Sequence, residues 1–293
     1  MVRRHELTDE QWQALQPLLP VSGAKGRPRV DDRRVINGML FKAKTGVSWR
    51  DLPERYGPWK TVYNRFWRWS RNGTLTMLVA KVRVIAEAID ELDREVSVDS
   101  SIVRAHQHAA GARRRPRAHT GASGSCGGQT EPDDHAIGRS RGGLSTKIHL
   151  ACDGHGRPLA TVLTGGNTND CTMFEAVLAG VWFPPARPGR LATRPARLIA
   201  DKGYSSRAIR GYLRRRGIRA TIPERRDQRD GRVRRGRAGG RPPLFDPVIY
   251  KRRNVVERCF NRLKQFRAIA TRYDKTALSY QAMIDLATLT FWL

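Results

Sequence analysis

From residue 95 onward the chain alternates short β-prone segments with amphipathic helical segments, and this alternation restricts the fold more than any other feature. Strands are predicted at 95–104, 145–153, 158–166, 196–201 and 218–224. The Asp153-Gly154 turn joins the second and third strands, as in a hairpin. Helical spacing of apolar residues predicts helices at 171–182 and 207–217. This order of segments predicts a mixed α/β sheet of five strands with helices packed on it.

The first 90 residues are predicted to be entirely helical. Thr8 and Gln11 form a capping box at the start of one helix, and Gly46 ends a second helix. A short helix over 49–52, a turn, and a longer helix over 61–71 have the pattern of a helix-turn-helix DNA reader. The candidate DNA contacts on and beside the longer helix are Lys60, Asn64, Arg65 and Arg68. The alternative is an ordinary small bundle with solvated arginines; in both interpretations Trp49, Trp59 and Trp67 are expected in the core.

These two patterns divide the chain into an all-α domain over 1–90 and an α/β domain over 91–293. Two stretches of the second domain, 107–143 and 225–246, are rich in Gly, Arg, Pro and Ser and contain few apolar residues. Such a composition is typical of mobile basic loops, although plain disorder without a role is the alternative. Because their charge is strongly one-signed, we expect these loops to neutralise phosphates.

The net charge of the whole chain indicates its partner. Lysine and arginine number 55 against 27 acidic residues, which gives a formal charge of +28. Nucleic acid is the leading partner for such a chain, and an anionic membrane ranks low because no basic amphipathic anchor or long apolar span is present. The four cysteines are scattered without a CxxC pair, which fits a reducing interior. We therefore expect a cytoplasmic, nucleoid-associated protein with no small-molecule substrate.

The segment 250–264, YKRRNVVERCFNRLK, carries the most informative spacing. In an α-helix the side chains of Tyr250, Arg253, Glu257 and Lys264 lie within roughly 60° of one another. An apolar stripe runs beside them, formed by Val256, Cys259, Phe260 and Leu263. A surface helix needs only a core face and a solvent face. The third face, one carboxylate flanked by two cations and a phenol, indicates a site where a metal-binding carboxylate meets a polyanion.

Two aspartates join this glutamate as candidate metal ligands. Asp99 lies inside the first predicted strand, and Asp201 lies at the end of the fourth. A carboxylate in or next to a buried strand is costly unless it is paired or bound to a metal. Carboxylate oxygens suit Mg²⁺, and two such ions about 3.5–4 Å apart can activate a nucleophile and stabilise a leaving oxygen in phosphodiester chemistry.

The same residues resemble a known family. Tyr250-x2-Arg253-x3-Glu257-x6-Lys264 matches the Y-R-E-K signature of bacterial insertion-sequence DDE transposases. The segments VDSSIVRAHQH, GRSRGGLSTKIHLACDGHGRPL, GGNTND and ADKGY resemble blocks of its insertion-sequence-five-like branch, and the leading LTDEQWQALQPLLP and SWRDLPERYGPWKTVYNRFWRW resemble that branch's helical domain. The resemblance covers nearly the whole chain except the basic loops.

The resemblance implies a ribonuclease-H-like catalytic domain, preceded by a helix-turn-helix-like domain, that cleaves and joins DNA. Asp99, Asp201 and Glu257 would bind two Mg²⁺ ions, or Mn²⁺ as a substitute. Tyr250, Arg253, Lys264 and Lys202 would touch DNA phosphates. The partners would be element ends and target DNA, with the protein acting as a homo-oligomer. Two alternatives stay open: a non-cleaving DNA-binding regulator, and a structure-specific nuclease of the same fold.

Overall fold

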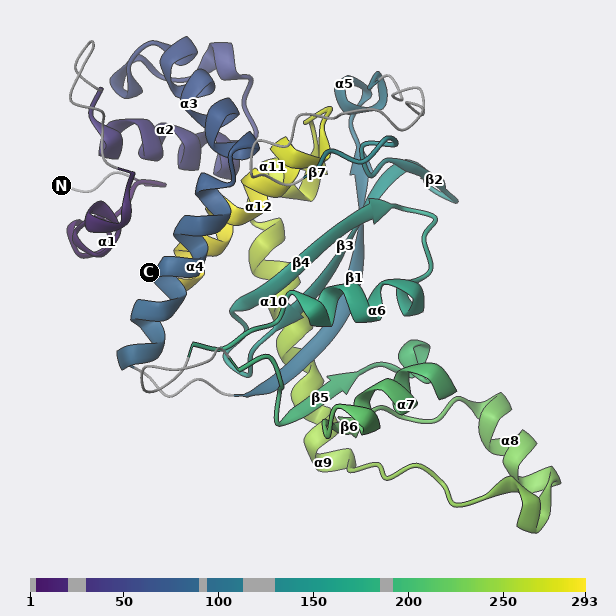
Figure 1. The fold of residues 1–293 in the computed structure, drawn as a ribbon. Helices are drawn as coiled ribbons and strands as arrows, with labels where there is room; N and C mark the ends of the chain where they lie inside the picture. The colour runs from purple at the N-terminus through teal and green to yellow at the C-terminus, as the bar shows by residue number, and fades with distance from the viewer. Residues whose placement is uncertain (1–3, 21–29, 90–93, 113–129, 185–191) are drawn as a thin grey trace, which may run out of the picture.

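The structure is a computed structural model that describes residues 4–20, 30–89, 94–112, 130–184 and 192–293. The elements of residues 94–293 are placed around one mixed sheet (Figure 1). Its core order is β4-β3-β1-β5-β6. The strands are β1 (Glu95–Ala105), β3 (Gly143–Cys152), β4 (Pro158–Gly165), β5 (Arg197–Ala200) and β6 (Arg219–Thr221). All five predicted strands are present.

Strand direction in this sheet follows the ribonuclease-H-like pattern. β1, β3 and β4 are antiparallel neighbours, whereas β5 is parallel to β1 and β6 is parallel to β5. The sheet also contains two short strands that the sequence did not predict: β2 (Gly138–Ser140) pairs with β3, and β7 (Thr271–Arg272) pairs with the end of β1. The predicted five-stranded sheet is therefore correct in its core and extended at its rim.

Helices cover both faces of the sheet. Helix α6 (Asp170–Ala179) packs on β3 and β4 from one side, and α10 (Asn254–Lys264) packs on β1 and β3 from the other. Because both faces are covered, β3 is buried from Ser145 to Cys152 and does not alternate between apolar and polar residues. Helix α7 (Arg207–Arg215) connects β5 to β6, and α5 (Gln107–Ala110) follows β1.

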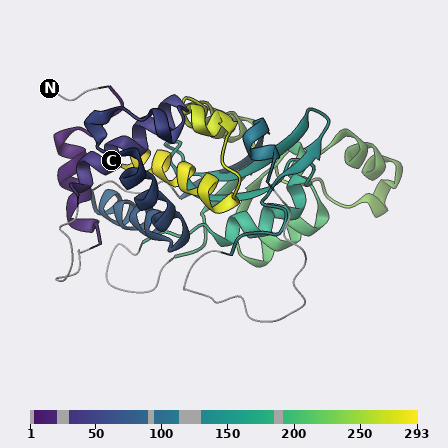
Figure 2. The same cartoon turned by 90° about the horizontal axis from the view of Figure 1, so that it is seen from above.

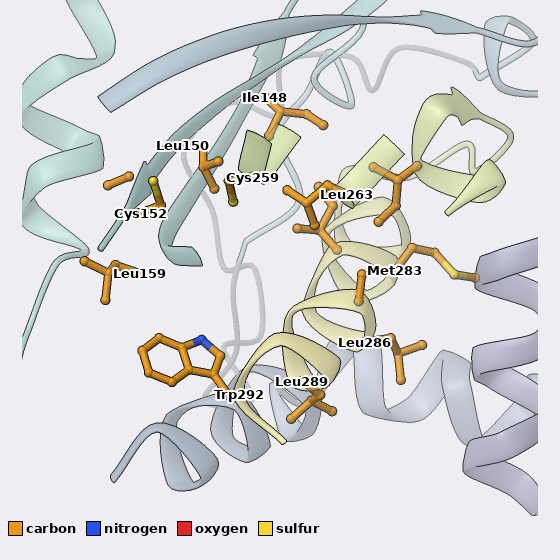
Figure 3. Close-up of a cluster of buried hydrophobic side chains, with 14 of the residues drawn as sticks. Ile148, Leu150, Cys152, Leu159, Cys259, Leu263, Met283, Leu286, Leu289 and Trp292 are labelled. Carbon is orange, nitrogen blue, oxygen red and sulfur yellow. The ribbon is translucent and has the colours of Figure 1, made fainter. Parts of the chain in front are cut away.

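The terminal helix α12 (Ala277–Trp292) joins the sheet to the N-terminal helices. Figure 3 shows Ile148 and Leu150 of β3, Leu263 of α10 and Leu286 and Leu289 of α12 in one apolar cluster. The opposite side of α12 contacts α2 (Asp32–Thr45), α3 (Trp59–Arg71) and α4 (Thr74–Ile89). Figure 2 shows α12 between the strands and the N-terminal helices. A helix buried on all sides is apolar all round, as the sequence of α12 is.

The N-terminal helices begin and end close to their predicted positions. Thr8 accepts the backbone N–H of Gln11 and so starts α1 (Asp9–Leu15), which continues into η1 (Gln16–Leu18). Gly46 ends α2 with a φ of 73°, a conformation that glycine adopts without strain. Two single turns, η2 (Trp49–Asp51) and η3 (Glu54–Tyr56), lead to α3. The first helix of the predicted helix-turn-helix is thus only a 3₁₀ turn.

The two predicted basic loops contain more structure than their composition indicated. In the first, Ala136 and Ile137 are buried, and Glu131 accepts the backbone N–H groups of Ala277 and Leu278 at the start of α12. Residues 113–129 of that loop lie outside the described residues. The second contains α8 (Arg226–Arg234) and η5 (Gly236–Gly239), which project from the sheet (Figure 1). The loop assignment is therefore wrong for residues 226–234 and 236–239, which are helical, while the mobility of these stretches stays a prediction.

Candidate active site

Asp99 lies on the face of the sheet that α10 covers. It is paired with Leu150 across β1 and β3, and directly paired residues point to the same face. Leu150 belongs to the apolar cluster with α10 and α12 (Figure 3). The carboxylate of Asp99 therefore points towards the helix that carries Glu257, as the sequence analysis expected.

Asp201 follows directly after β5 and lies next to Asp99. The parallel register pairs Val98 of β1 with Ala200 of β5. The residues that follow them, Asp99 and Asp201, are therefore neighbours. The Asp201 carboxylate accepts the backbone N–H of Gly203 at 2.9 Å and caps η4 (Lys202–Tyr204). Two carboxylates from adjacent strands thus lie at one point of the sheet.

Arg253 connects Asp99 to Glu257. Its Nη1 donates to Oδ2 of Asp99 at 2.8 Å, and its Nη2 donates to Oε1 of Glu257. Glu257 is one helical turn further along the chain, so one guanidinium can bond both carboxylates. The predicted cluster of Asp99, Asp201 and Glu257 is brought to the same region, with Arg253 placed between two of its members.

The pKa of Asp99 reflects a balance of opposing effects. Burial raises it from its ordinary value, while the backbone N–H of Ser100 and the Arg253 guanidinium oppose the rise, and the nearby Asp201 carboxylate adds to it. A carboxylate desolvated beside a second carboxylate gains from a nearby cation. Arg253 supplies that positive charge from the protein itself.

The donor chemistry of this cluster fits a hard divalent cation. Asp99, Asp201 and Glu257 offer only carboxylate oxygens, the ligands that Mg²⁺ prefers. In the part of the chain that the structure describes, no three histidine, cysteine, aspartate or glutamate side chains are already grouped to hold a metal ion. Arg253 holds one oxygen of each of two carboxylates, Oδ2 of Asp99 and Oε1 of Glu257, and these two oxygens would have to turn from the guanidinium to bind a metal.

The segment 250–264 is not one continuous helix as predicted. Tyr250 ends α9 (Pro247–Tyr250), Arg253 ends η6 (Lys251–Arg253), and only Glu257 and Lys264 lie on α10. The backbone stays right-handed helical through the junction, which keeps the side chains near one face. The predicted apolar stripe is confirmed, because Val256, Cys259, Phe260 and Leu263 are buried.

The remaining predicted phosphate contacts lie around this cluster. Lys264 donates from Nζ to the hydroxyl of Ser101 at 2.6 Å, two residues beyond Asp99 on the same face of β1. The Tyr250 ring packs on Phe245 with centroids 5.3 Å apart. Lys202 is exposed next to Asp201. The sequence analysis did not identify Ser101, although its place in the strand, two residues from Asp99, assigns it to the same face.

On the other face of β3, polar side chains surround His149. Its Nε2 lies 2.8 Å from the Thr164 hydroxyl, and Asp170 forms an ion pair with Lys147 at 2.9 Å. Burial lowers the pKa of His149 to about 4. Tyr204, which follows Asp201 in η4, is buried nearby, and burial raises its pKa. On this face α6 contacts the turn after Asp201, since the Phe174 ring packs on Tyr204.

The predicted DNA contacts of the N-terminal helices separate into two groups. Lys60, Asn64 and Arg68 are exposed on α3. Arg65 is only 7% exposed and donates to Asp32 of α2 at 2.5 Å, so its charge is used inside the helical bundle. Trp67, which was expected in the core, is instead 44% exposed, with the Arg71 guanidinium over its ring.

Two protein-family models match the chain, one in each half. The model described as "Transposase DDE domain" matches residues 90–292. The model DUF4096, which describes transposases of the IS4/5 family, matches residues 7–79. The described residues contain no helix long and apolar enough to cross a membrane.

Individual relatives agree with these matches. The chain is 33% identical over 161 residues to the transposase assigned to insertion sequence element IS402 of Burkholderia cepacia, which covers 54% of this chain and 67% of that protein. It is 27% identical over 150 residues to the transposase assigned to element IS6501 of Brucella ovis, covering 51% of this chain and 99% of that one. A solved Mos1 transposase paired-end complex aligns over 93% of this chain and 80% of its own at 13% identity, but the TM-score of 0.25 is too low to equate the two folds.

Proposed function

This chain belongs to the transposase DDE domain family and is a DDE transposase, an enzyme that cleaves and joins DNA strands, and we propose that Asp99, Asp201 and Glu257 are its catalytic metal-binding carboxylates. The observation that carries this proposal is their arrangement around Arg253. Asp99 and Asp201 are neighbours in register, and Arg253 bonds both Asp99 and Glu257.

The proposed cofactor is Mg²⁺, with two ions and with Mn²⁺ as a substitute. Bound divalent ions would supply activation of the attacking hydroxyl or water and stabilisation of the leaving oxygen. For Glu257 to offer both of its oxygens to a metal, Oε1 must turn from Arg253. The freed guanidinium is then available to a DNA phosphate, for which its fork of N–H donors is suited.

The residues around the carboxylates would hold the DNA backbone. Lys264 bonds Ser101, two residues beyond Asp99, and Lys202 directly follows Asp201. Tyr250 presents a phenol one turn before Arg253. In this proposal these three side chains, together with Arg253, fix the scissile phosphate against the carboxylates, which is the positioning that phosphoryl transfer requires.

Recognition of the element's inverted-repeat ends is assigned to the N-terminal helices. The exposed face of α3 carries Lys60, Asn64 and Arg68, whose amide and basic groups are the kinds that read base edges in the major groove. We propose a DNA-binding domain over 1–90 and a catalytic domain over 91–293, acting as a homo-oligomer on element ends and target DNA. A cytoplasmic, nucleoid-associated location follows from this substrate.

The experiment is incubation of the full chain with DNA carrying the element ends, in Mg²⁺, Mn²⁺, Ca²⁺ or excess chelator, followed by mapping of cut and joined products. We expect cutting and joining with Mg²⁺ or Mn²⁺, binding without efficient cutting in Ca²⁺, and no cutting in chelator. Glu175→Gln, on the exposed surface of α6, is the matched control for Glu257→Gln.

The alternatives predict other products. Binding without cutting under every metal condition would identify a DNA-binding regulator. Cutting without joining or end preference would identify a nuclease of the same fold. Robust cutting in chelator would contradict the two-metal proposal.

A further inference from the structure

A basic cleft lies between α7 and the arm formed by residues 225–246. Its first compartment has a volume of about 430 Å³ and is lined by six arginines, Arg207, Arg210, Arg214, Arg232, Arg235 and Arg241. A second compartment of about 740 Å³ shares Arg210, Arg214 and Arg241 with the first. The cleft therefore concentrates positive charge in a concave surface outside the carboxylate cluster.

The acidic residues of the cleft do not neutralise this charge. Glu224 is bonded by Arg232 at 2.7 Å, and Asp246 accepts the backbone N–H groups of Val248 and Ile249. Within the described residues, no hydrogen bond or ion pair is found for the side chains of Arg207, Arg214 or Arg241. Three guanidinium groups are thus available to an anion.

The cleft is organised by the protein's own contacts. Gln228 of α8 donates to the backbone carbonyl of Ser205 at 2.5 Å and accepts from its hydroxyl at 2.8 Å. Gly239 allows η5 to lie close to α8, since a Cβ there would come within 2.1 Å of the Arg232 carbonyl oxygen. The arm is consequently anchored against the turn that begins at Asp201, four residues before Ser205.

The second compartment adds apolar surface to the arginines. Leu213, Ile218 and Ile249 line it, and so does Leu244, which is 87% exposed. A positively charged groove that follows the phosphates is one feature of single-strand binding sites, and guanidinium planes can stack on unstacked bases. Cavities of about 300–1,000 Å³ hold ligands of drug size, comparable to one or two nucleotides, and are too small for a whole duplex.

We propose that this cleft binds a single DNA strand that leaves the catalytic carboxylates on the Asp201 side, with Arg207, Arg214 and Arg241 on its phosphates. The inference rests on the proposed function, and assigns a binding site to one strand of the DNA that the carboxylates act on. The formal charge of +28 makes an acidic segment of a second copy a poor occupant by comparison.

The test compares binding of the full chain to a blunt end duplex and to the same duplex with a 5′ or a 3′ single-stranded tail, in Ca²⁺ at fixed salt. Arg214→Gln combined with Arg241→Gln removes charge inside the cleft. Arg226→Gln combined with Arg229→Gln is the matched control and removes the same amount of charge. Both residues are exposed on the same arm but line neither compartment of the cleft. Thermal unfolding verifies that all proteins are folded.

We expect the natural sequence to bind one of the tailed duplexes about tenfold more tightly than the blunt one. The single-stranded tail would add one or two charge-assisted hydrogen bonds that the blunt duplex cannot form. The cleft variant should lose this preference. The control should weaken binding to tailed and blunt duplexes alike and keep it. A 5-iodouracil in the tail should crosslink to residues 205–215 or 224–246.

Three results would overturn the proposal: no preference for either tail in the natural sequence, equal loss of preference in both variants, or a cleft variant that keeps its tail preference. The proposed function fails independently, through absence of cutting in Mg²⁺. Cutting without tail preference would reject the cleft alone.

Discussion

Arg65 on α3 and Arg253 beside α10 each bond an aspartate from a different element, at 2.5 Å to Asp32 and 2.8 Å to Asp99. Their surroundings differ. Arg65 is buried over the Trp69 ring, whereas the side chain of Arg253 is 19% exposed and also bonds Glu257. A buried pair holds two helices together, while a guanidinium shared between two reachable carboxylates can exchange partners. The comparison shows that a basic residue on a helix face must be assigned from its acidic neighbours.

The largest effect is expected when the three carboxylates near Arg253 are replaced one at a time. Asp99→Asn, Asp201→Asn and Glu257→Gln should each lower the cleavage rate at least about 1,000-fold, because an amide is a poor ligand for a hard cation. Binding to element ends should stay within a few-fold. The measurement is single-turnover cleavage alongside a binding titration. Cleavage at the natural rate by any variant would remove that residue from the catalytic set.

The role of Arg65 on α3 is tested by removing its ion pair with Asp32. Arg65→Ala removes the buried guanidinium and its bond to Asp32, and we expect a loss of about 2 kcal/mol in the free energy of unfolding. Denaturant unfolding measures this loss. Preference for element ends over random duplex should be unchanged in the folded fraction. A fully stable Arg65→Ala protein with lost end preference would show that Arg65 reads bases after all.

Arg68 provides the converse of Arg65 on the same helix. Because Arg68 is exposed, Arg68→Ala should change the free energy of unfolding by no more than about 0.5 kcal/mol. If it reads a base, binding to element ends should weaken about tenfold or more, while binding to random duplex changes less. Titration of both duplexes at several salt concentrations separates base reading from general charge. Equal weakening on both duplexes would make Arg68 a phosphate contact.

The smallest expected effect concerns the sheet face opposite Asp99. Burial lowers the pKa of His149 to about 4, below its ordinary value of 6.5. Between these values the unfolded chain binds more protons at this position than the folded one, so stability rises with pH; the contribution is complete above pH 6.5 and declines as pH falls towards 4. From pH 6.5 down to 5.5, the natural sequence should lose about 1 kcal/mol more than His149→Gln. Identical pH profiles of unfolding would contradict the lowered pKa.

Local patterns were sufficient to predict much of the fold. The strands next to Asp99 and Asp201 follow from apolar runs and turn residues that neighbour each other in the sequence, and the stripe from Val256 to Leu263 follows from helical spacing. These features depend on a few residues at a time. The sequence therefore predicted the five main strands and the carboxylates that two of them position.

Long-range pairing was beyond those patterns. Arg65 and Arg68 were both predicted as DNA contacts, and the bond to Asp32, 33 residues away, assigns Arg65 to the helical bundle instead. The contact of Arg253 with Asp99 spans 154 residues. Helix α8 was missed because its composition, rich in arginine and glycine, is that of a loop, and its anchor Gln228 bonds a turn 23 residues earlier. Such contacts are set by the tertiary fold.

The packing of α12 has a consequence for how DNA would be measured. Residues on both sides of the proposed boundary near residue 90 share one core, and Thr76 of α4 donates to Asp285 of α12 at 2.7 Å. A reading helix and a cutting site joined through a common core keep a constant separation, so the protein body works as a ruler. The cut should then fall at a fixed number of base pairs from the recognised sequence. Inserting base pairs between that sequence and the element's end should leave the cut at its old distance, and a cut that follows the displaced end would contradict the ruler.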